Sequence, residues 1–116
     1  CGTFNDLILA NGAKISRLTA KNKSIELHDK GFNENIDEVK LKYKKGDMVY
    51  LMTNGYADQY GGGLKTKFTL ERLTELISQS NFLNINDQKE LFSENFYKWK
   101  GEEDQTDDVL LIGIRL

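Results

Sequence analysis

The sequence predicts an α+β domain, because two kinds of hydrophobic spacing occupy different parts of the chain. Short apolar runs and alternating polar and apolar residues indicate strands in the first half, as at 7–10 and 48–52. Residues 69–100 change to the three- and four-residue spacing of amphipathic helices. A last apolar run at 109–114 indicates another strand. Strands on both sides of two consecutive helices favour a sheet covered by helices.

The composition fits one ordinary globular domain and excludes several other classes. The chain has 116 residues, with 16 basic and 18 acidic side chains, and its formal net charge is −2. This near balance gives no general electrostatic reason to bind nucleic acid. No apolar run approaches the ~20 residues that a membrane-spanning helix needs. We therefore expect neither nucleic acid nor membrane as a partner of this segment.

The first strands are predicted from a turn signal and from alternation. The run 7–10 ends at Asn11-Gly12, a dipeptide that suits a tight hairpin because both residues tolerate positive φ. Residues 14–19 alternate in polarity and are expected to return as the second strand. A further short strand is expected at 24–27, followed by a polar loop at 28–38.

Two more strands are predicted before the helical region. Residues 39–44 alternate apolar residues with lysines, which indicates a strand with one face in water. Gly46 and Asp47 form a turn, and the continuous apolar run 48–52 is expected to be a strand covered on both faces.

The two helices are predicted from their caps and apolar faces. Thr69 is expected to cap the first helix, and the second begins near Asn84 or Asn86 and ends at Gly101. An acidic loop, 102–108, leads into a buried final strand within 107–116. The apolar side chains expected to face the core are Leu70, Leu73, Leu76, Ile77, Leu91, Phe92, Phe96 and Trp99.

Two segments carry more polar residues than packing requires. The apolar run 48–52 ends on the polar sequence Thr53-Asn54-Gly55, and Asp107-Asp108 directly precedes the last strand. Carboxylates at strand ends are a common way to hold cations that prefer oxygen ligands, such as Mg²⁺ and Mn²⁺. Asp58 nearby is expected either to cap a helix or to lie behind such ligands.

These motifs resemble those of a known enzyme family. Gly46-Asp47 followed by Thr53-Asn54-Gly55, and then Gln105-Thr106-Asp107-Asp108, are similar to the "GD-x-x-x-x-x-TDG" and "DD-x-x" segments of metal-dependent (PPM-type, 2C-class) serine/threonine phosphatases in the SpoIIE/RsbU-like branch. Residues 56–62 and 99–101 look like a sub-branch fused to bacterial sensor proteins. The resemblance implies a PPM-like β-sandwich flanked by helices, of which residues 1–116 form a single partial domain from the C-terminal half.

The resemblance also implies an activity, a cofactor and partners. Two Mn²⁺ or Mg²⁺ ions held by aspartates activate a water for hydrolysis of phosphoserine or phosphothreonine, so no side chain of the chain is expected to be a covalent catalyst. The expected substrate is a phosphorylated regulator such as an anti-sigma-factor antagonist. The expected setting is cytoplasmic, with an upstream sensor domain in the parent chain.

The chain departs from the family pattern at two places. Nothing matches the "D-x-S/T-G-H-G" segment of the first half, since the only histidine, His28, lies in HDKG. Asn54 replaces the metal-binding aspartate of "TDG", and a neutral amide is the weaker ligand for a divalent cation. The expected metal ligands are therefore Asp107, Asn54 as a degenerate position, and Asp108, which either binds metal or orients the strand.

Three interpretations follow for the chain as a whole. The first is an incomplete or impaired phosphatase fragment, and the second is a pseudophosphatase module that binds a partner or relays a signal. The third treats Cys1 as the lipid-bearing end of a lipoprotein, whereas a cut from a longer chain is the favoured explanation of this terminus. Because half a domain exposes strand edges, we also expect dimerisation or strand exchange.

Overall fold

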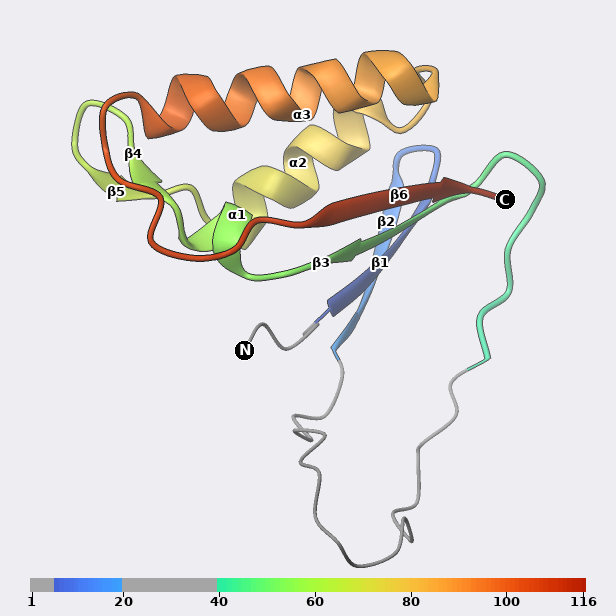
Figure 1. The fold of residues 1–116 in the computed structure, drawn as a ribbon. Coiled ribbons are helices and arrows are strands. Elements are labelled where there is room, and N and C mark those ends of the chain that lie inside the picture. The colour runs from blue at the N-terminus through green and yellow to red at the C-terminus, as the bar shows by residue number, and fades with distance from the viewer. Residues whose placement is uncertain (1–5, 20–39) are drawn as a thin grey trace, which may run out of the picture.

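The computed structural model describes residues 6–19 and 40–116. Its main feature is a four-stranded antiparallel sheet in the order β2-β1-β3-β6, with two long helices on one face (Figure 1). A small second sheet pairs β4 with β5. The α+β class is therefore confirmed. In chain order the elements are β1 (Asp6–Asn11), β2 (Lys14–Thr19), β3 (Met48–Met52), α1 (Gly55–Asp58), β4 (Tyr60–Gly61), β5 (Thr66–Lys67), α2 (Leu70–Ser80), α3 (Ile85–Lys100) and β6 (Leu111–Arg115).

The first hairpin forms where the sequence predicts it, with its turn one residue later. Asn11 and Lys14 are the last paired residues of β1 and β2, so the two-residue turn is Gly12-Ala13. Gly12 has φ +57°, which suits the first central position of a tight hairpin turn and strains any residue with a Cβ. This hairpin fixes the register of β1, which then pairs with β3.

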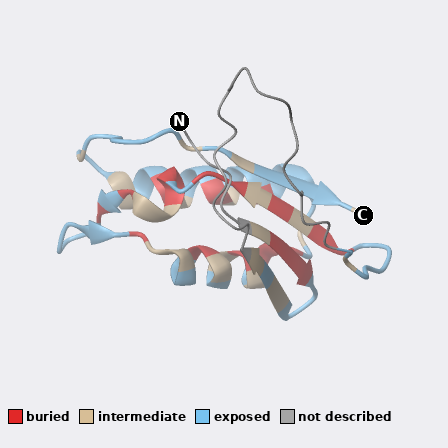
Figure 2. Cartoon of the chain, turned by 90° about the horizontal axis from the view of Figure 1, so that it is seen from below, coloured by how far each residue is buried: buried red, intermediate tan, exposed pale blue. Residues whose placement is uncertain are grey.

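The core lies between the helices and one face of the sheet (Figure 2). Alternate residues of β1 and β3 point toward the helices and are buried, including Ile8 and Tyr50. From the helices, Leu73, Ile77 and Phe92 pack against them. Burying each such side chain contributes roughly 1.5–3 kcal/mol, so this single layer of contacts accounts for much of the fold's stability.

Both helices begin at the predicted type of cap. The Thr69 hydroxyl accepts a hydrogen bond from Arg72 N at 3.5 Å, and Asn84 Oδ1 accepts one from Asp87 N at 2.9 Å. Of the two expected starts of the second helix, Asn84 is therefore the one used. Gly101 ends α3 with φ +54°. No helix in the described ranges is long and apolar enough to cross a membrane.

The predicted strand at 39–44 is wrong where the structure describes it. Residues 40–44 have no regular structure, because their end is folded into a turn around a buried carboxylate. Asp47 Oδ2 accepts hydrogen bonds from Lys44 N at 2.7 Å and from Asn11 Nδ2 at 3.0 Å. The expected strand at 24–27 and the loop at 28–38 lie outside the described residues.

The predictions that β3 is covered on both faces and that the last strand is buried are also wrong. Val49 and Leu51, on the face of β3 away from the helices, are only half-buried. In β6, Ile112 and Ile114 are exposed, because their side chains lie on the face away from the helices and β6 has only β3 as a neighbour among the described strands. The helices cover one face only. The aliphatic residues on the other face are Leu7, Leu9, Leu18, Val49, Leu51, Ile112 and Ile114.

Candidate metal centre

The predicted site residues meet where β3 ends and β6 begins. We call this region, residues 53–55 and 105–110, the strand-end corner. The two strands are antiparallel neighbours with Met52 opposite Leu111, so the residues after β3 lie beside the residues before β6. Asn54, Asp107 and Asp108 are thus brought together, and all three are exposed to solvent.

Thr53 holds the two sides of the corner together. Its buried hydroxyl donates to Asp108 O at 2.7 Å and accepts from Leu110 N at 2.9 Å. Its backbone N–H donates to Leu110 O at 3.0 Å. A hydroxyl is needed here because it acts as donor and acceptor at the same time. Thr53 therefore fixes the main chain immediately after the carboxylate pair.

Gly55 brings α1 into direct contact with the other side of the corner. A Cβ built on Gly55 would lie 2.3 Å from Asp108 O, which no side chain tolerates. Asn54 immediately precedes this residue, and its carbonyl accepts from Asp58 N at 2.9 Å. The Gly in Thr-Asn-Gly is thus required by packing, and it keeps position 54 close to the aspartates.

The carboxylate pair is ordered by local hydrogen bonds. Asp107 Oδ1 accepts from Asp108 N at 2.8 Å, and Gln105 Nε2 donates to Asp107 O at 3.0 Å. One oxygen of Asp107 is therefore engaged by the backbone, which sets the direction of the side chain. Asp58 instead forms an ion pair with Lys67 at 2.9 Å, so the structure shows it in neither of its two expected roles.

A buried glutamine, which the sequence analysis does not single out, supports the acidic loop. Gln59 is 2% exposed, and its Nε2 donates to Asp104 O at 2.9 Å and to Tyr60 O at 2.9 Å. The backbone carbonyl of Gln59 accepts a hydrogen bond from Trp99 Nε1 at 3.1 Å. A single Gln that follows a loop motif belongs to no repeating pattern of polar and apolar residues. Its support of the acidic loop is therefore seen only in the structure, where its side chain is buried.

Trp99 fastens the segment between α1 and α2 to the end of α3. Gly62 N donates to Trp99 O at 2.8 Å, and a Cβ on Gly61 would lie 1.9 Å from that same oxygen. The Arg72 guanidinium lies 4.4 Å from the centroid of the indole ring. The glycines at 61–62 are therefore required by packing. Together with Gln59 they hold the segment 59–62 against the end of α3.

Two tyrosines lie in the core between the sheet and α3. Tyr50 Oη donates to Gln88 Oε1 at 2.7 Å, and Tyr56 Oη donates to Phe92 O at 2.8 Å. Burial raises the pKa of Tyr50 to about 12, although the positive charge of Arg115 opposes the shift. Burial also raises the pKa of Tyr56. Both hydroxyls therefore stay protonated and act as structural donors at neutral pH.

The donor set matches a hard divalent cation in kind but not in number. Carboxylate and amide oxygens are the ligands that Mg²⁺ and Mn²⁺ prefer. In residues 6–19 and 40–116, however, no three His, Cys, Asp or Glu side chains gather into a group able to hold a metal ion. Metal binding at Asp107, Asn54 and Asp108 stays a prediction, and it requires further ligands beyond those that the structure describes.

Comparison with known proteins identifies the fold. No protein-family model and no curated protein matches the sequence. The solved SiaA-PP2C domain of Pseudomonas aeruginosa is similar to this chain with a TM-score of 0.82 and 22% sequence identity. The likeness covers 96% of this chain and 42% of that one.

At this level of identity the comparison shows the fold. The chain has the fold of part of that solved PP2C domain, which confirms the PPM-like fold that the sequence resemblance implies. The chain spans less than half of the solved domain's length. In the described residues one four-stranded sheet of the expected sandwich is present.

Proposed function

We propose that this chain supplies the C-terminal part of a metal-dependent serine/threonine phosphatase domain. The observation that carries the proposal is the strand-end corner, where Thr53 and Gly55 hold Asn54 beside the Asp107-Asp108 pair on a PP2C-type fold. In this proposal Asp107 supplies a carboxylate oxygen, Asn54 a weaker amide oxygen, and Asp108 either a ligand or a backbone support. The remaining ligands come from outside the described residues.

The proposed chemistry is hydrolysis of phosphoserine or phosphothreonine. Bound Mn²⁺ or Mg²⁺ would lower the pKa of a water and offset the charge of the phosphoryl oxygens. The chain's own part is to present oxygen ligands on a rigid support, which Gln59 and Trp99 provide. The proposed substrate is a phosphorylated regulatory protein of the anti-sigma-factor-antagonist type, dephosphorylated in the cytoplasm under the control of an upstream sensor domain.

A direct measurement of Mn²⁺ affinity tests the role of the corner. The full-length protein is titrated with Mn²⁺ and the free ion is followed by electron paramagnetic resonance. Asp107→Asn is expected to weaken binding at least tenfold, because a carboxylate charge is lost at the ligand. The matched control is Asp104→Asn, an exposed aspartate of the same loop whose backbone carries its described contact. Equal affinities for these two variants would contradict the proposal.

A pseudophosphatase is the second candidate, and Asn54 is the observation that favours it. The residue is exposed at the corner, and no packing constraint on its side chain explains the loss of a carboxylate there. The discriminating comparison is wild type against Asn54→Asp in the full-length protein, with a phosphoserine peptide and Mn²⁺. A silent wild type and an active variant would support the pseudophosphatase. Equal turnover by both would exclude it.

A further inference from the structure

The first part of the acidic loop is held by the segment that follows α1. Figure 1 shows the loop passing beside β4, β5 and α1 before it enters β6. The buried side chain of Gln59 donates to Asp104 O at 2.9 Å. A second link is the ion pair between Lys65 Nζ and Glu103 Oε1 at 2.8 Å. Two neighbouring residues of the loop are therefore tied to the segment 59–65.

The last part of the loop is held at the other end of α1. Thr53 Oγ1 donates to Asp108 O at 2.7 Å, and Gly55 packs against that same oxygen. The short helix α1 joins this contact to the first one, because it begins at Gly55 and is capped at its C-terminal end by Gln59. Residues 104–108 are therefore attached at both ends to one continuous piece of chain.

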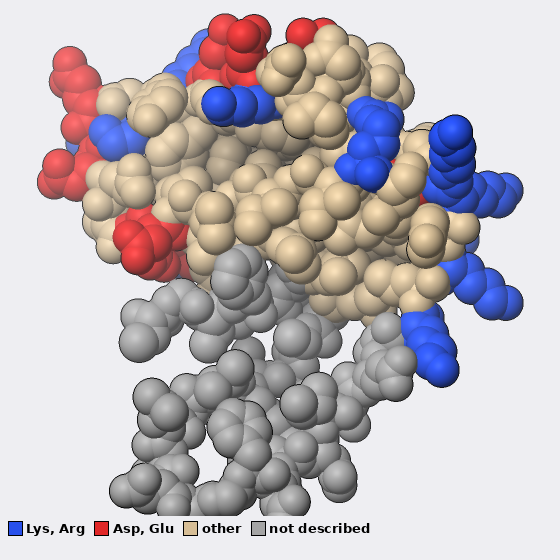
Figure 3. Space-filling model, turned by 45° about the vertical axis from the view of Figure 1, so that its right-hand side comes forward, with Lys and Arg blue, Asp and Glu red and all other residues tan. Residues whose placement is uncertain are grey.

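The wider distribution of charge does not gather a cation at the strand-end corner. Figure 3 shows Asp and Glu in several separate groups on the face in view, with Lys and Arg side chains among them. Lys65 pairs with Glu103 and Lys67 with Asp58, so these two carboxylates are already matched by cations. Because salt screens exposed charges at longer range, the affinity for a divalent cation depends on where individual carboxylates are placed.

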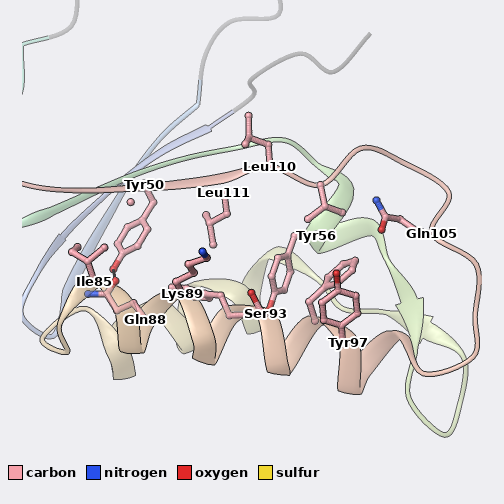
Figure 4. Close-up of a pocket in the computed structure, with 14 residues that line it drawn as sticks. Tyr50, Tyr56, Ile85, Gln88, Lys89, Ser93, Tyr97, Gln105, Leu110 and Leu111 are labelled. Atoms are coloured by element: carbon pink, nitrogen blue, oxygen red, sulfur yellow. Dashed lines mark hydrogen bonds between the residues drawn. The ribbon is translucent and has the colours of Figure 1, made fainter.

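The placement of Asp107 depends on the loop that carries it. Asp107 Oδ1 accepts from Asp108 N at 2.8 Å and Asp107 O accepts from Gln105 Nε2 at 3.0 Å, so both of these partners belong to the loop itself. Gln105 also lines the cavity between the sheet and α3 (Figure 4). The position of Asp107 relative to Asn54 is therefore set by the two attachments of the loop.

We propose that the segment 59–65 positions the acidic loop, with Gln59 as its main positioning residue, and thereby sets the affinity of the strand-end corner for a divalent cation. The inference rests on the proposed function, because it takes Asp107 as a metal ligand. The bond from the Gln59 amide to Asp104 O is shielded from water and is therefore stronger than an exposed one. Mg²⁺ binds only close to its ideal coordination geometry, so a loosened ligand loses affinity.

The first experiment compares Gln59→Met with Gln88→Met in the full-length protein. Gln88 is the matched control, because it is 3% exposed and donates to Leu83 O at 2.9 Å, near the start of α3. Both variants should lower Tm. Only Gln59→Met should weaken Mn²⁺ binding, measured by electron paramagnetic resonance, by at least about tenfold, as loss of a bond that supports a metal ligand does. Without metal, hydrogen exchange of the Glu103 and Asp108 amides should be several-fold faster in Gln59→Met alone.

A second pair of variants tests the other link at surface positions that leave the core intact. Glu103→Gln removes the ion pair with Lys65, whereas Glu102→Gln removes the same charge one residue earlier. Because the pair is exposed, Glu103→Gln should weaken Mn²⁺ binding only about twofold relative to Glu102→Gln. Isothermal titration calorimetry resolves this difference. Equal affinities for the two variants would contradict a positioning role for the segment.

The outcomes separate this inference from the proposed function. If Asp107→Asn leaves Mn²⁺ affinity unchanged, the proposed function fails and the inference fails with it. If Asp107→Asn weakens binding but Gln59→Met does not, only the inference fails. It also fails if Gln88→Met weakens binding as much as Gln59→Met, since loss of stability would then explain both. Faster exchange in Gln59→Met with wild-type Mn²⁺ affinity would overturn it too, because the bond would order the loop without acting on the metal.

Discussion

Replacing Thr53 by valine tests whether one hydroxyl holds the strand-end corner together. Valine has the same shape and suits a strand, so the change removes the hydroxyl without opening a cavity. Two hydrogen bonds are lost, from the hydroxyl to Asp108 O and from Leu110 N to the hydroxyl. The bond from Thr53 N to Leu110 O is retained, so the strand pairing itself survives.

The expected cost follows from these two bonds. Each contributes about 1 kcal/mol net, and the two backbone groups left without partners in a half-buried place add to this. We expect the free energy of unfolding to fall by roughly 2–3 kcal/mol, which lowers Tm by about 8–12 °C for a domain of this size. Thr53→Ser keeps both bonds and loses a methyl group, so it should cost only about 1 kcal/mol.

Urea unfolding followed by the fluorescence of Trp99 measures both variants. The slope of free energy against urea should be unchanged, so that the midpoint alone reports stability. A second readout is Mn²⁺ affinity in the full-length protein, which should fall for the valine variant and not for the serine variant. If Thr53→Val is no less stable than Thr53→Ser, the hydroxyl does not support the corner and our account of it is wrong.

Three further predictions concern packing and pH. Gly55→Ala should cost at least about 2 kcal/mol, because its Cβ would meet Asp108 O at 2.3 Å; Gly63→Ala, with open space around it, is the thermal-melt control. The free energy of unfolding should fall by roughly 3 kcal/mol between pH 10 and 12, because Tyr50 ionises at a lower pH in the unfolded chain than in the folded one. Urea titrations of Tyr50→Phe should show a smaller fall. Trp99→Phe should speed hydrogen exchange in residues 60–67, because the bond from the indole to Gln59 O is lost; unchanged exchange would contradict this.

The sequence predicts those parts of the fold that neighbouring residues decide. Thr69 and Asn84 cap their helices with bonds to residues three positions away, so the signal and its structural effect lie in one turn. The hairpin turn at Gly12-Ala13 is similarly local. The convergence of Asn54 with Asp107 and Asp108 is not local. It was expected from the resemblance to a phosphatase family, and the pairing of β3 with β6 places these residues at one end of the sheet.

The failed predictions depend on what lies beside a segment. Residues 40–44 alternate like a strand, but the carboxylate of Asp47 binds the backbone of Lys44 and turns the chain instead. The final strand has the composition of a core strand, yet Ile112 and Ile114 lie on the face that the helices do not cover and are exposed. Sequence composition records that these side chains suit burial and does not say which surface covers them.

The pairing of β3 with β6 also bears on the order in which the chain folds. These adjacent strands are separated in sequence by both long helices, so closing their ladder requires an entropically costly loop. The β1–β2 hairpin and the two helices involve local contacts and should form first. The strand-end corner would then be assembled in the last stage of folding. A protein trapped before that stage would have native helix content but would not yet bring Asn54 beside Asp107 and Asp108.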